Sequence, residues 1–366
     1  MRLLPFSCLL LCALTSGPRT TLAQAYRQAR RQLEFEGIFQ RTLSRHDRQI
    51  SFVHRVRNNA RAPLRQVEIS LAVPRNNARQ HIHRLEFTPK PTRTTTDGWE
   101  QETAYFEIDS IPAGGEAEVR LKASVTLLDL QWMLTDRDVG TLDEIPERVV
   151  RHYLRNGDNY KLEEAIVQRA AKRIKANEGS ILERVRRIHD FVIDTIEYSR
   201  DDRWDPADRV LREGKGSCSE YSYLMIALLR LNGIPARYAG GSWIEKNGVS
   251  PPRDSSLWIE TFVDRIFHRW VEVYLPRCGW FPVDPTQDDV ADKEGDPYRY
   301  FGRLPWSYFT LTHGDGDKFE SGPLGWEYRS NTRWLGGVGV ESRNVLVERF
   351  AIWKAPEIAA GAAAGN

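Results

Sequence analysis

Apolar and polar residues alternate along much of the first third of the chain, and short polar or glycine-containing turns interrupt the alternation. This pattern is typical of short β-strands with one buried face. It predicts strands over residues 50–56, 67–73, 81–87, 103–108 and 117–127. Regular short strands separated by such turns predict a β-sandwich that occupies residues 26–130.

After residue 130 the apolar residues recur at the spacing of a helix. Pro146 is expected to open one helix, and residues 162–176 to form another. Ser180 and Glu183 have the spacing of a capping box, in which each residue satisfies a free N–H group of the other. We predict a helix from Ser180, with a structural His189 beside its apolar stripe, and a short helix capped by Asp205 that leads towards Gly214.

The segment 214–235 combines a glycine-containing turn with a strongly apolar helix that begins near Cys218. The helix is expected to end at Asn232-Gly233, and one of its faces to be core. Free amide groups and the helix dipole favour a negative charge at a helix N-terminus, so the Cys218 thiol is expected to ionise early. The alternative interpretation is a small buried cysteine that packs the start of the helix.

A β-hairpin is predicted downstream, with strands over 268–275 and 280–286 and a turn over 276–279. It brings His268 and Asp284 onto neighbouring strands, offset by about one residue. A cysteine, a histidine and an aspartate are the groups that nucleophilic thiol catalysis requires. The histidine takes the thiol proton, and the aspartate orients the imidazole ring and stabilises its charged form.

These segments resemble the transglutaminase-like superfamily, which comprises papain-like thiol enzymes. The matching stretches lie within residues 180–286: Gly214-Lys-Gly-Ser-Cys218, Leu228-Leu-Arg-Leu-Asn-Gly-Ile-Pro-Ala-Arg237, His268-Arg-Trp-Val-Glu-Val-Tyr274 and Gly279-Trp-Phe-Pro-Val-Asp-Pro-Thr286. The resemblance implies an α+β fold in which a papain-like catalytic domain over 131–355 follows the β-sandwich domain. It also implies Cys218 as the nucleophile, His268 as the base and Asp284 as the orienting acid. Residues 356–366 are predicted to be a disordered tail.

The N-terminus has the pattern of an export signal: Arg2, an apolar run over 3–14 and a small-residue cleavage motif ending at Ala25. The apolar run is too short to span a bilayer, and no later stretch approaches the required length. We therefore predict a signal peptide over 1–25, a periplasmic or secreted protein and no membrane span. Cys8 and Cys12 fall inside this leader.

The net charge of +2 corresponds to 52 basic and 50 acidic residues, and removal of the leader's two arginines leaves 50 of each. This balance argues against a nucleic-acid partner, which would need a basic face. Outside the leader the cysteines are Cys218 and Cys278, too few for a disulfide framework. We expect Cys278 to be a lone thiol in a turn, because a bridge to Cys218 would block the nucleophile.

Two further sets of polar side chains have a composition that could bind a metal ion. His81 and His83 share one strand face, and a cluster of acidic residues begins at Asp288 and ends at Asp296. Both sets are interpreted as solvated surface, so neither a metal nor a cofactor is predicted. The Cys218 amide is the natural oxyanion donor, and Tyr198 and Trp204 are candidates for a second one. Residues 240–267 are expected to form a loop beside the cleft.

The favoured function is that of an exported thiol enzyme acting on a protein or cell-wall peptide, with hydrolysis by a peptidase or amidase preferred. A protein cross-linking acyl transferase, which passes the acyl group from glutamine to an amine, shares the same chemistry up to the thioester. A non-catalytic scaffold that binds peptides or glycans is the third alternative, since eight of the 11 tryptophans lie at or beyond Trp243.

Overall fold

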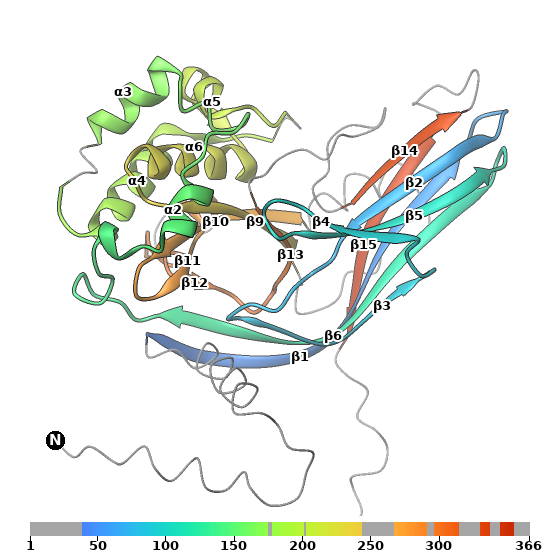
Figure 1. Cartoon of the computed structure of the whole chain (residues 1–366), viewed down its shortest axis with the longest axis horizontal. Coiled ribbons are helices and arrows are strands. Elements are labelled where there is room, and N and C mark those ends of the chain that lie inside the picture. Colours follow the sequence, from blue (N-terminus) through green and yellow to red (C-terminus); the bar gives the residue numbers. More distant parts are fainter. Residues whose placement is uncertain are drawn as a thin grey trace, which may run out of the picture. The chain divides into compact units, whose positions relative to one another are not determined.

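The computed structural model describes residues 39–174, 178–200, 203–243, 267–290, 296–314, 330–336 and 345–354. The expected signal peptide and the expected disordered tail lie outside the described residues. The chain from Phe39 onwards forms one compact unit. The described part of this unit consists of two strand systems, a short parallel pair of strands and a group of helices (Figure 1). The parallel pair is formed by β7 (Glu197–Tyr198) and β8 (Lys215–Gly216).

Two antiparallel sheets form a β-sandwich. The first has the order β12-β6-β1-β15 with β3 also paired to β6, and the second has the order β14-β2-β5-β4. The strands of the first sheet are β1 (Gln40–Asn58), β3 (Gln80–Thr88), β6 (Glu116–Trp132), β12 (Arg303–Leu304) and β15 (Val345–Lys354). Those of the second are β2 (Leu64–Ala72), β4 (Arg93–Thr96), β5 (Glu102–Ile111) and β14 (Ser330–Gly336). Side chains from both sheets share one core, with Phe52 and Leu121 on one side and Ile69 and Phe106 on the other. The predicted sandwich is confirmed.

The sandwich differs from its prediction in the length of its strands and in the part of the chain that supplies some of them. The first half of β1 and the whole of β4 consist of exposed or half-buried residues, so they lack the apolar period that would reveal them. The strands β14 and β15 pair with β2 and β1. The expected division at residue 130 stays a prediction, but these two C-terminal strands pair with the sandwich rather than with the helical part.

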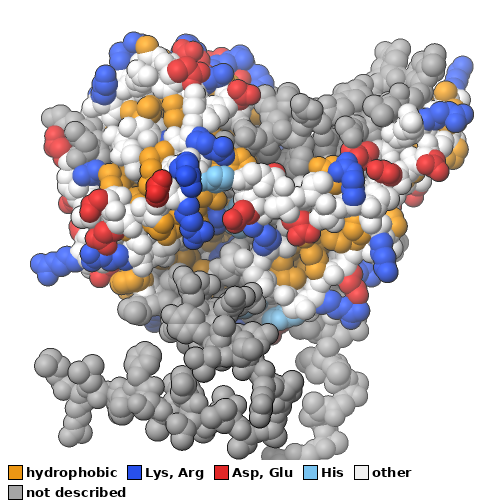
Figure 2. Space-filling model, viewed as in Figure 1, with side chains coloured by type: hydrophobic (Ala, Val, Ile, Leu, Met, Phe, Trp, Pro, Cys, Tyr) orange, Lys and Arg blue, Asp and Glu red, His pale blue; other side chains and the backbone are white. Residues whose placement is uncertain are grey.

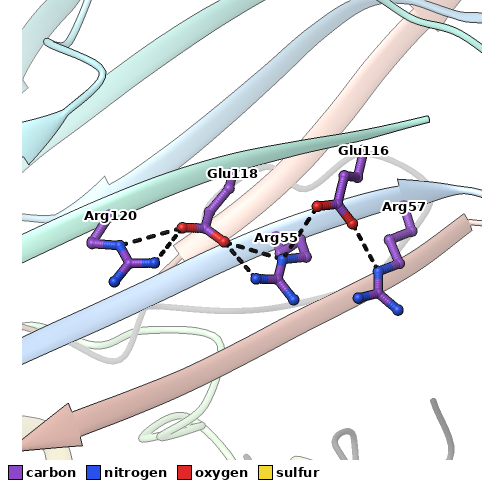
Figure 3. A network of polar contacts seen from close by, with 5 residues as sticks. All are labelled: Arg55, Arg57, Glu116, Glu118 and Arg120. Atoms are coloured by element: carbon purple, nitrogen blue, oxygen red, sulfur yellow. Dashed lines mark hydrogen bonds and ion pairs between the residues drawn. The ribbon is translucent and has the colours of Figure 1, made fainter. Parts of the chain in front are cut away.

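The outward face of β1 and β6 carries charged pairs (Figure 3). Arg55 lies opposite Glu118 and Arg57 opposite Glu116 in the register. Arg55 and Arg120 both bind Glu118, at 2.6 and 2.7 Å, and Arg57 binds Glu116 at 3.0 Å. Cross-strand pairs of this kind stabilise a sheet by about 0.2–1 kcal/mol each. They also disfavour a register shifted by two residues, which would place Arg55 opposite Arg120.

The second strand system is a four-stranded antiparallel sheet of order β11-β10-β9-β13. Its strands are β9 (Ala236–Trp243), β10 (Phe267–Leu275), β11 (Gly279–Val283) and β13 (Tyr308–Gly314). Helix α6 packs against β9 and β10, and helices α3, α4 and α5 pack around α6 (Figure 1). These helices are α3 (Ala165–Arg173), α4 (Ile181–Thr195), α5 (Ala207–Glu213) and α6 (Cys218–Leu231). The combination of sandwich and helix-covered sheet is the expected α+β fold.

Helix α6 is buried on every side, since each residue from Cys218 to Arg230 is buried. The sequence predicted a single core face. The difference arises because other helices cover the sides of α6 that face away from the sheet, and a helix that is apolar all round is typical of such a central position. The thiol at its first residue is thereby held on the most enclosed helix of the described fold.

The helix ends follow the predicted signals with one exception. Helix α4 has the complete capping box of Ser180 and Glu183. Helix α2 (Glu147–Tyr153) has Pro146 as its N-cap, and α6 ends before Gly233, whose φ is 73°. Helix α5 is capped by Pro206 and not by Asp205. The Asp205 carboxylate instead binds the Arg209 guanidinium at 3.1 Å, one turn into the helix.

Acidic and basic side chains are interspersed on the face of the molecule drawn in Figure 2, as the balanced composition predicts for a surface without a strong charge. Within the described residues, no helix combines the length and the apolar character needed to cross a bilayer.

Candidate active site

Cys218 is the first residue of α6, and the backbone before it is shaped by glycines. Gly214 has a left-handed φ of 66°. A Cβ atom at Gly216 would lie 2.3 Å from the Cβ of Glu220, so only glycine fits there. Cys218 is 9% exposed, and its amide belongs to the first helical turn, whose N–H groups have no partner within the helix. The sequence thus places a nearly buried sulfur at the positive end of a helix dipole.

Glu220 holds this turn together, although it is not among the site residues predicted from the sequence. Its carboxylate accepts hydrogen bonds from the Ser217 amide at 2.8 Å, the Ser217 hydroxyl at 2.7 Å and the Asp205 amide at 2.9 Å. Burial raises the pKa of Glu220. The Ser-x-x-Glu spacing of 217–220 is a capping-box signal and could have revealed the residue.

His268 and Asp284 come from the predicted hairpin. Strands β10 and β11 pair Val271 with Val283, so Asp284 follows directly on the end of β11. His268 Nε2 lies 2.6 Å from Asp284 Oδ2, and both residues are buried. In this register position 286 lies opposite His268, so Asp284 is offset from it by two positions. The two residues therefore lie on the same side of the hairpin and can meet. The sequence predicted an offset of about one.

Cys218 and His268 interact as a charged pair. Nε2 of His268 is engaged by Asp284, so Nδ1 is the ring nitrogen that remains for the thiol. Burial raises the pKa of Cys218, but the hydrogen bond and charge of His268, together with the charge of Arg269, lower it to about 7. Burial lowers the pKa of His268, but Asp284 and then Cys218 raise it to about 10. Between these values the thiolate and the imidazolium are the favoured forms.

Tyr308 is a further residue of the site that the sequence did not indicate. Its hydroxyl lies 3.3 Å from Asp284 Oδ2, the same oxygen that faces His268. Its ring centroid lies 5.3 Å from that of His268 and 5.4 Å from that of Trp270. Tyr308 is buried on β13, and burial raises its pKa well above the ordinary value, so the phenol stays a donor. No local motif marks it, because its contacts are made across the sheet.

Gly240 and Gly241 lie in strand β9 and not in the expected loop. Gly241 pairs with His268 on one side and with Thr310 on the other. A Cβ atom at Gly241 would lie 2.1 Å from the Phe309 carbonyl oxygen. The glycine is therefore required by the close approach of β13. Residues 242–243 of the expected loop also belong to β9, and Phe267 begins β10. Residues 244–266 lie outside the described residues.

The two candidates for a second oxyanion donor have different surroundings. Tyr198 is 43% exposed, and burial followed by the charge of Cys218 raises its pKa, which places its phenol within electrostatic reach of the sulfur. Trp204 is half-buried, and the Arg269 guanidinium lies 5.2 Å from the centre of its ring. The assignment of a donor role to either residue stays a prediction.

The acidic residues after Asp284 are not all solvated, contrary to expectation. Residues Pro285–Val290 form helix α8, and the Asp288 side chain is buried against His189. The neighbouring Asp289 accepts a hydrogen bond from the Tyr221 hydroxyl, while Asp296 is exposed. The prediction failed because a run of acidic residues resembles a surface loop when the buried histidine that pairs with it lies 99 residues away.

Potential metal ligands do not converge in the part of the chain that the structure describes. His81 and His83 have parallel rings with centroids 6.2 Å apart on β3, and His83 also contacts the Thr126 hydroxyl at 2.8 Å. The absence of a metal or cofactor requirement stays a prediction.

Cys278 is free of a disulfide, and so is Cys218. Its sulfur lies 3.7 Å from the Asp138 carbonyl oxygen, and burial raises its pKa to about 11. The expectation of a lone turn thiol is confirmed. The pKa values of Cys218 and Cys278 are therefore shifted in opposite directions from the ordinary value.

Residues 168–285 match the model of the transglutaminase-like superfamily, and this stretch contains the Cys218, His268 and Asp284 positions. This segment belongs to the transglutaminase-like superfamily. Among curated proteins, the chain is 25% identical over 166 residues to YebA of Bacillus subtilis, an uncharacterised protein; the match covers 43% of this chain and 20% of YebA. It is 33% identical over 110 residues to a protein-glutamine gamma-glutamyltransferase of Pseudomonas aeruginosa, covering 25% of this chain and 15% of that protein. The chain thus spans a fifth or less of these two relatives.

Among solved structures, the chain resembles that of a "Putative Cysteine Protease" from Cytophaga hutchinsonii. The TM-score is 0.55 at 16% identity, and the match covers 87% of this chain and 93% of the other. At this identity the likeness shows the fold alone. It covers more of the chain than residues 168–285, which the family model matches.

Proposed function

We propose that this chain is a thiol enzyme of acyl transfer in which Cys218 is the nucleophile, His268 the acid and base and Asp284 the orienting group. One observation carries the proposal: a cysteine at the start of a buried helix interacts with a histidine whose Nε2 lies 2.6 Å from a buried aspartate. The histidine lowers the pKa of this cysteine to about 7. A purely structural role does not explain this arrangement. Burying three ionisable groups costs free energy even when they are paired, and apolar side chains would fill the same space at a lower cost.

The reaction follows from these positions. The Cys218 thiolate attacks the carbonyl carbon of a peptide or carboxamide, and the new C–S bond places negative charge on the oxygen. The Cys218 amide at the helix N-terminus donates to this oxyanion. The His268 imidazolium gives its proton to the nitrogen as the C–N bond breaks, which leaves a thioester and a free amine. A water molecule then attacks the thioester, His268 takes a proton from it, and the C–S bond breaks to release the acid.

We favour hydrolysis of the thioester, so the enzyme would be a peptidase or amidase. Transfer of the acyl group to a second amine is the alternative, and the named activity of the Pseudomonas aeruginosa relative favours it. Both routes share the thioester and differ only in whether water or an amine reaches it.

The proposed setting is outside the cytoplasm. The leader-like residues 1–25 support export to the periplasm or beyond. Protein or cell-wall peptides are the proposed substrates, because they supply carboxamide carbonyls in that setting. The chemistry needs neither a metal nor a cofactor, since the thiolate, the imidazole and the backbone donor provide all the required groups.

The test is to incubate the full chain with glutamine-containing and cell-wall-type peptides, with and without a fluorescent primary amine, and to follow products by mass. We expect hydrolysed product to exceed amine adduct, Cys218→Ala to abolish both and Cys278→Ala to change neither. An excess of adduct would instead establish the acyl transferase. Equal activity of Cys218→Ala and the unaltered chain, or no thioester with a reactive acyl probe, would favour a binding scaffold.

A further inference from the structure

A second buried histidine–aspartate pair lies next to the first. His189 Nε2 on α4 lies 2.9 Å from Asp288 Oδ2 on α8, and both side chains are inaccessible to solvent. Asp288 follows Asp284 by four residues, or about one helical turn. Acyl transfer at Cys218 uses Asp284 directly but has no direct role for His189 or Asp288.

Backbone hydrogen bonds connect this second pair to Asp284. The Tyr300 amide donates to Asp288 Oδ1 at 2.7 Å, and the Tyr300 carbonyl accepts from the Asp284 amide at 3.2 Å. The Asp288 amide in turn donates to the Asp284 carbonyl at 3.2 Å. Asp284, Tyr300 and Asp288 thus form a closed ring of hydrogen bonds. Any displacement of Asp288 must also move the backbone that carries Asp284.

The orientation of the Asp284 carboxylate depends on the same short helix. Oδ1 of Asp284 accepts from the Gln287 amide in the first turn of α8 at 3.1 Å, while Oδ2 faces His268 at 2.6 Å. Helix α8 spans only Pro285–Val290, and a helix of this length is not stable by itself. Its position must be fixed by contacts with other elements, and the bond from Asp288 to His189 ties it to α4.

His189 is held from both sides. Its Nδ1 lies 3.2 Å from Asp190 Oδ1, and the Tyr298 hydroxyl donates to the other oxygen of Asp190 at 2.9 Å. Its ring packs edge-on against Phe301, over which the Arg186 guanidinium lies at 5.6 Å. Carboxylate oxygens face both ring nitrogens, and only an imidazolium can donate to both.

The charge states of His189 and Asp288 agree with this geometry. Burial lowers the pKa of His189, but its hydrogen bonds to Asp190 and Asp288 outweigh burial and raise it. Burial raises the pKa of Asp288. The Tyr300 amide and the imidazolium nevertheless both require Asp288 as an acceptor, so the ion pair is the favoured form.

We propose that His189 and Asp288 are positioning residues for the active site: they anchor α8 to α4 and so keep the Asp284 carboxylate in line with the His268 ring. The proposal rests on the proposed function, since it assumes that the alignment of His268 matters for Cys218. Loss of the anchor weakens the pairing of Asp284 with His268, and this in turn raises the pKa of the Cys218 thiol.

The test measures how the rate of Cys218 alkylation by iodoacetamide depends on pH in the full chain and its variants. His189→Phe keeps a ring of similar size but removes both donors, and His189→Gln keeps one donor directed towards Asp288. Asp288→Asn breaks the pair from the other side. The matched control is His54→Phe, which replaces another fully buried histidine but lies on β1 in the sandwich. Thermal unfolding of each variant is followed in parallel.

In His189→Phe and Asp288→Asn we expect the Cys218 pKa to rise by about one unit, which slows alkylation at pH 6 about tenfold. In His189→Gln the alkylation rate at pH 6 should stay within about threefold of that of the unaltered chain. The glutamine side chain can still donate a hydrogen bond to Asp288, although it loses the one to Asp190. His54→Phe should change the unfolding temperature without moving the pH dependence.

An unchanged pH dependence in folded His189→Phe would overturn the proposal and leave the pair a purely structural role. If His189→Phe does not fold, Asp288→Asn decides the matter by the same criterion. Alkylation of Cys218 that is no faster than that of Cys278 at pH 6 in the unaltered chain is a different result. It would contradict the proposed function itself, and the positioning role would fall with it.

Discussion

His268 and Asp284 lie 16 positions apart in the sequence, yet Nε2 of the histidine and Oδ2 of the aspartate are 2.6 Å apart in the folded chain. The tight hairpin of β10 and β11 brings them together, and the first turn of α8 fixes the carboxylate. Because Asp284 occupies Nε2, the ring presents its other nitrogen to Cys218. The geometry at this contact therefore determines both the charge of His268 and the ionisation of the thiol.

Asp284→Asn should lower turnover at pH 7 by about 100-fold or more, by analogy with the loss of the orienting acid in other catalytic triads. The asparagine is isosteric but neutral, so it removes the charge that raises the pKa of His268. The imidazole then loses its proton near neutral pH, and the thiolate loses its counter-charge. Steady-state kinetics with a hydrolysed peptide would measure this. Tyr308→Phe is the matched control, because it removes a weaker 3.3 Å contact to the same oxygen and should cost less than tenfold.

The pH dependence of kcat/KM should be bell-shaped, with limbs near 7 and near 10. Protonation of the thiolate removes the nucleophile on the acid side, and loss of the imidazolium proton removes the acid catalyst on the alkaline side. The limbs belong to the coupled pair of groups rather than to either residue alone. A single limb near pH 9, typical of an ordinary thiol, would contradict the pairing of Cys218 with His268.

Gln80→Ala should destabilise the fold by about 2–4 kcal/mol, because it leaves two buried backbone groups without a partner. Gln80 accepts from the Thr310 amide at 2.8 Å and donates to the Thr310 carbonyl at 2.9 Å, so one side chain on β3 pairs with strand β13. Urea unfolding would measure the change. The exposed Gln168→Ala on α3 is the control and should change stability by less than about 0.5 kcal/mol. Equal effects of the two substitutions would contradict the pairing.

Gly241→Ala should cost about 1–3 kcal/mol or more of stability and also slow the reaction of Cys218, because the new methyl group must push β13 away from β9 beside His268. Gly98→Ala is the control, since a Cβ atom there meets no atom within 4 Å. Thermal unfolding together with the rate of thiol alkylation would separate the two effects. A Gly241→Ala variant as stable and as reactive as Gly98→Ala would mean that β9 and β13 are not packed as described.

Sequence patterns identified the parts of the fold that depend on local signals. The glycine turn, the apolar helix and the stop at Gly233 place Cys218 at a helix start. The hairpin pattern then places His268 and Asp284 on adjacent strands. These features are encoded within a few residues of each other, so apolar periodicity and turn chemistry are sufficient to predict them.

The remaining features depend on contacts between distant segments. Tyr308 and Asp288 belong to segments that show no motif, and their roles follow from partners on other elements. The pairing of β14 and β15 with the sandwich likewise depends on the tertiary structure. The alternation of apolar and polar residues in a strand does not specify which other strand it pairs with. Glu220 is the exception, since its capping-box spacing with Ser217 was present in the sequence.

The most direct test of the central claim is the pH at which Cys218 becomes reactive, measured by mass spectrometry of iodoacetamide-labelled peptides from the native chain. Cys278 serves as the internal standard. The expected result is half-maximal reactivity of Cys218 near pH 7, with Cys278 unreactive until the pH approaches 11, and a shift of Cys218 to higher pH in His268→Ala. Equal reactivity of the two cysteines at every pH, unchanged in His268→Ala, would contradict a thiolate–imidazolium pair at this site.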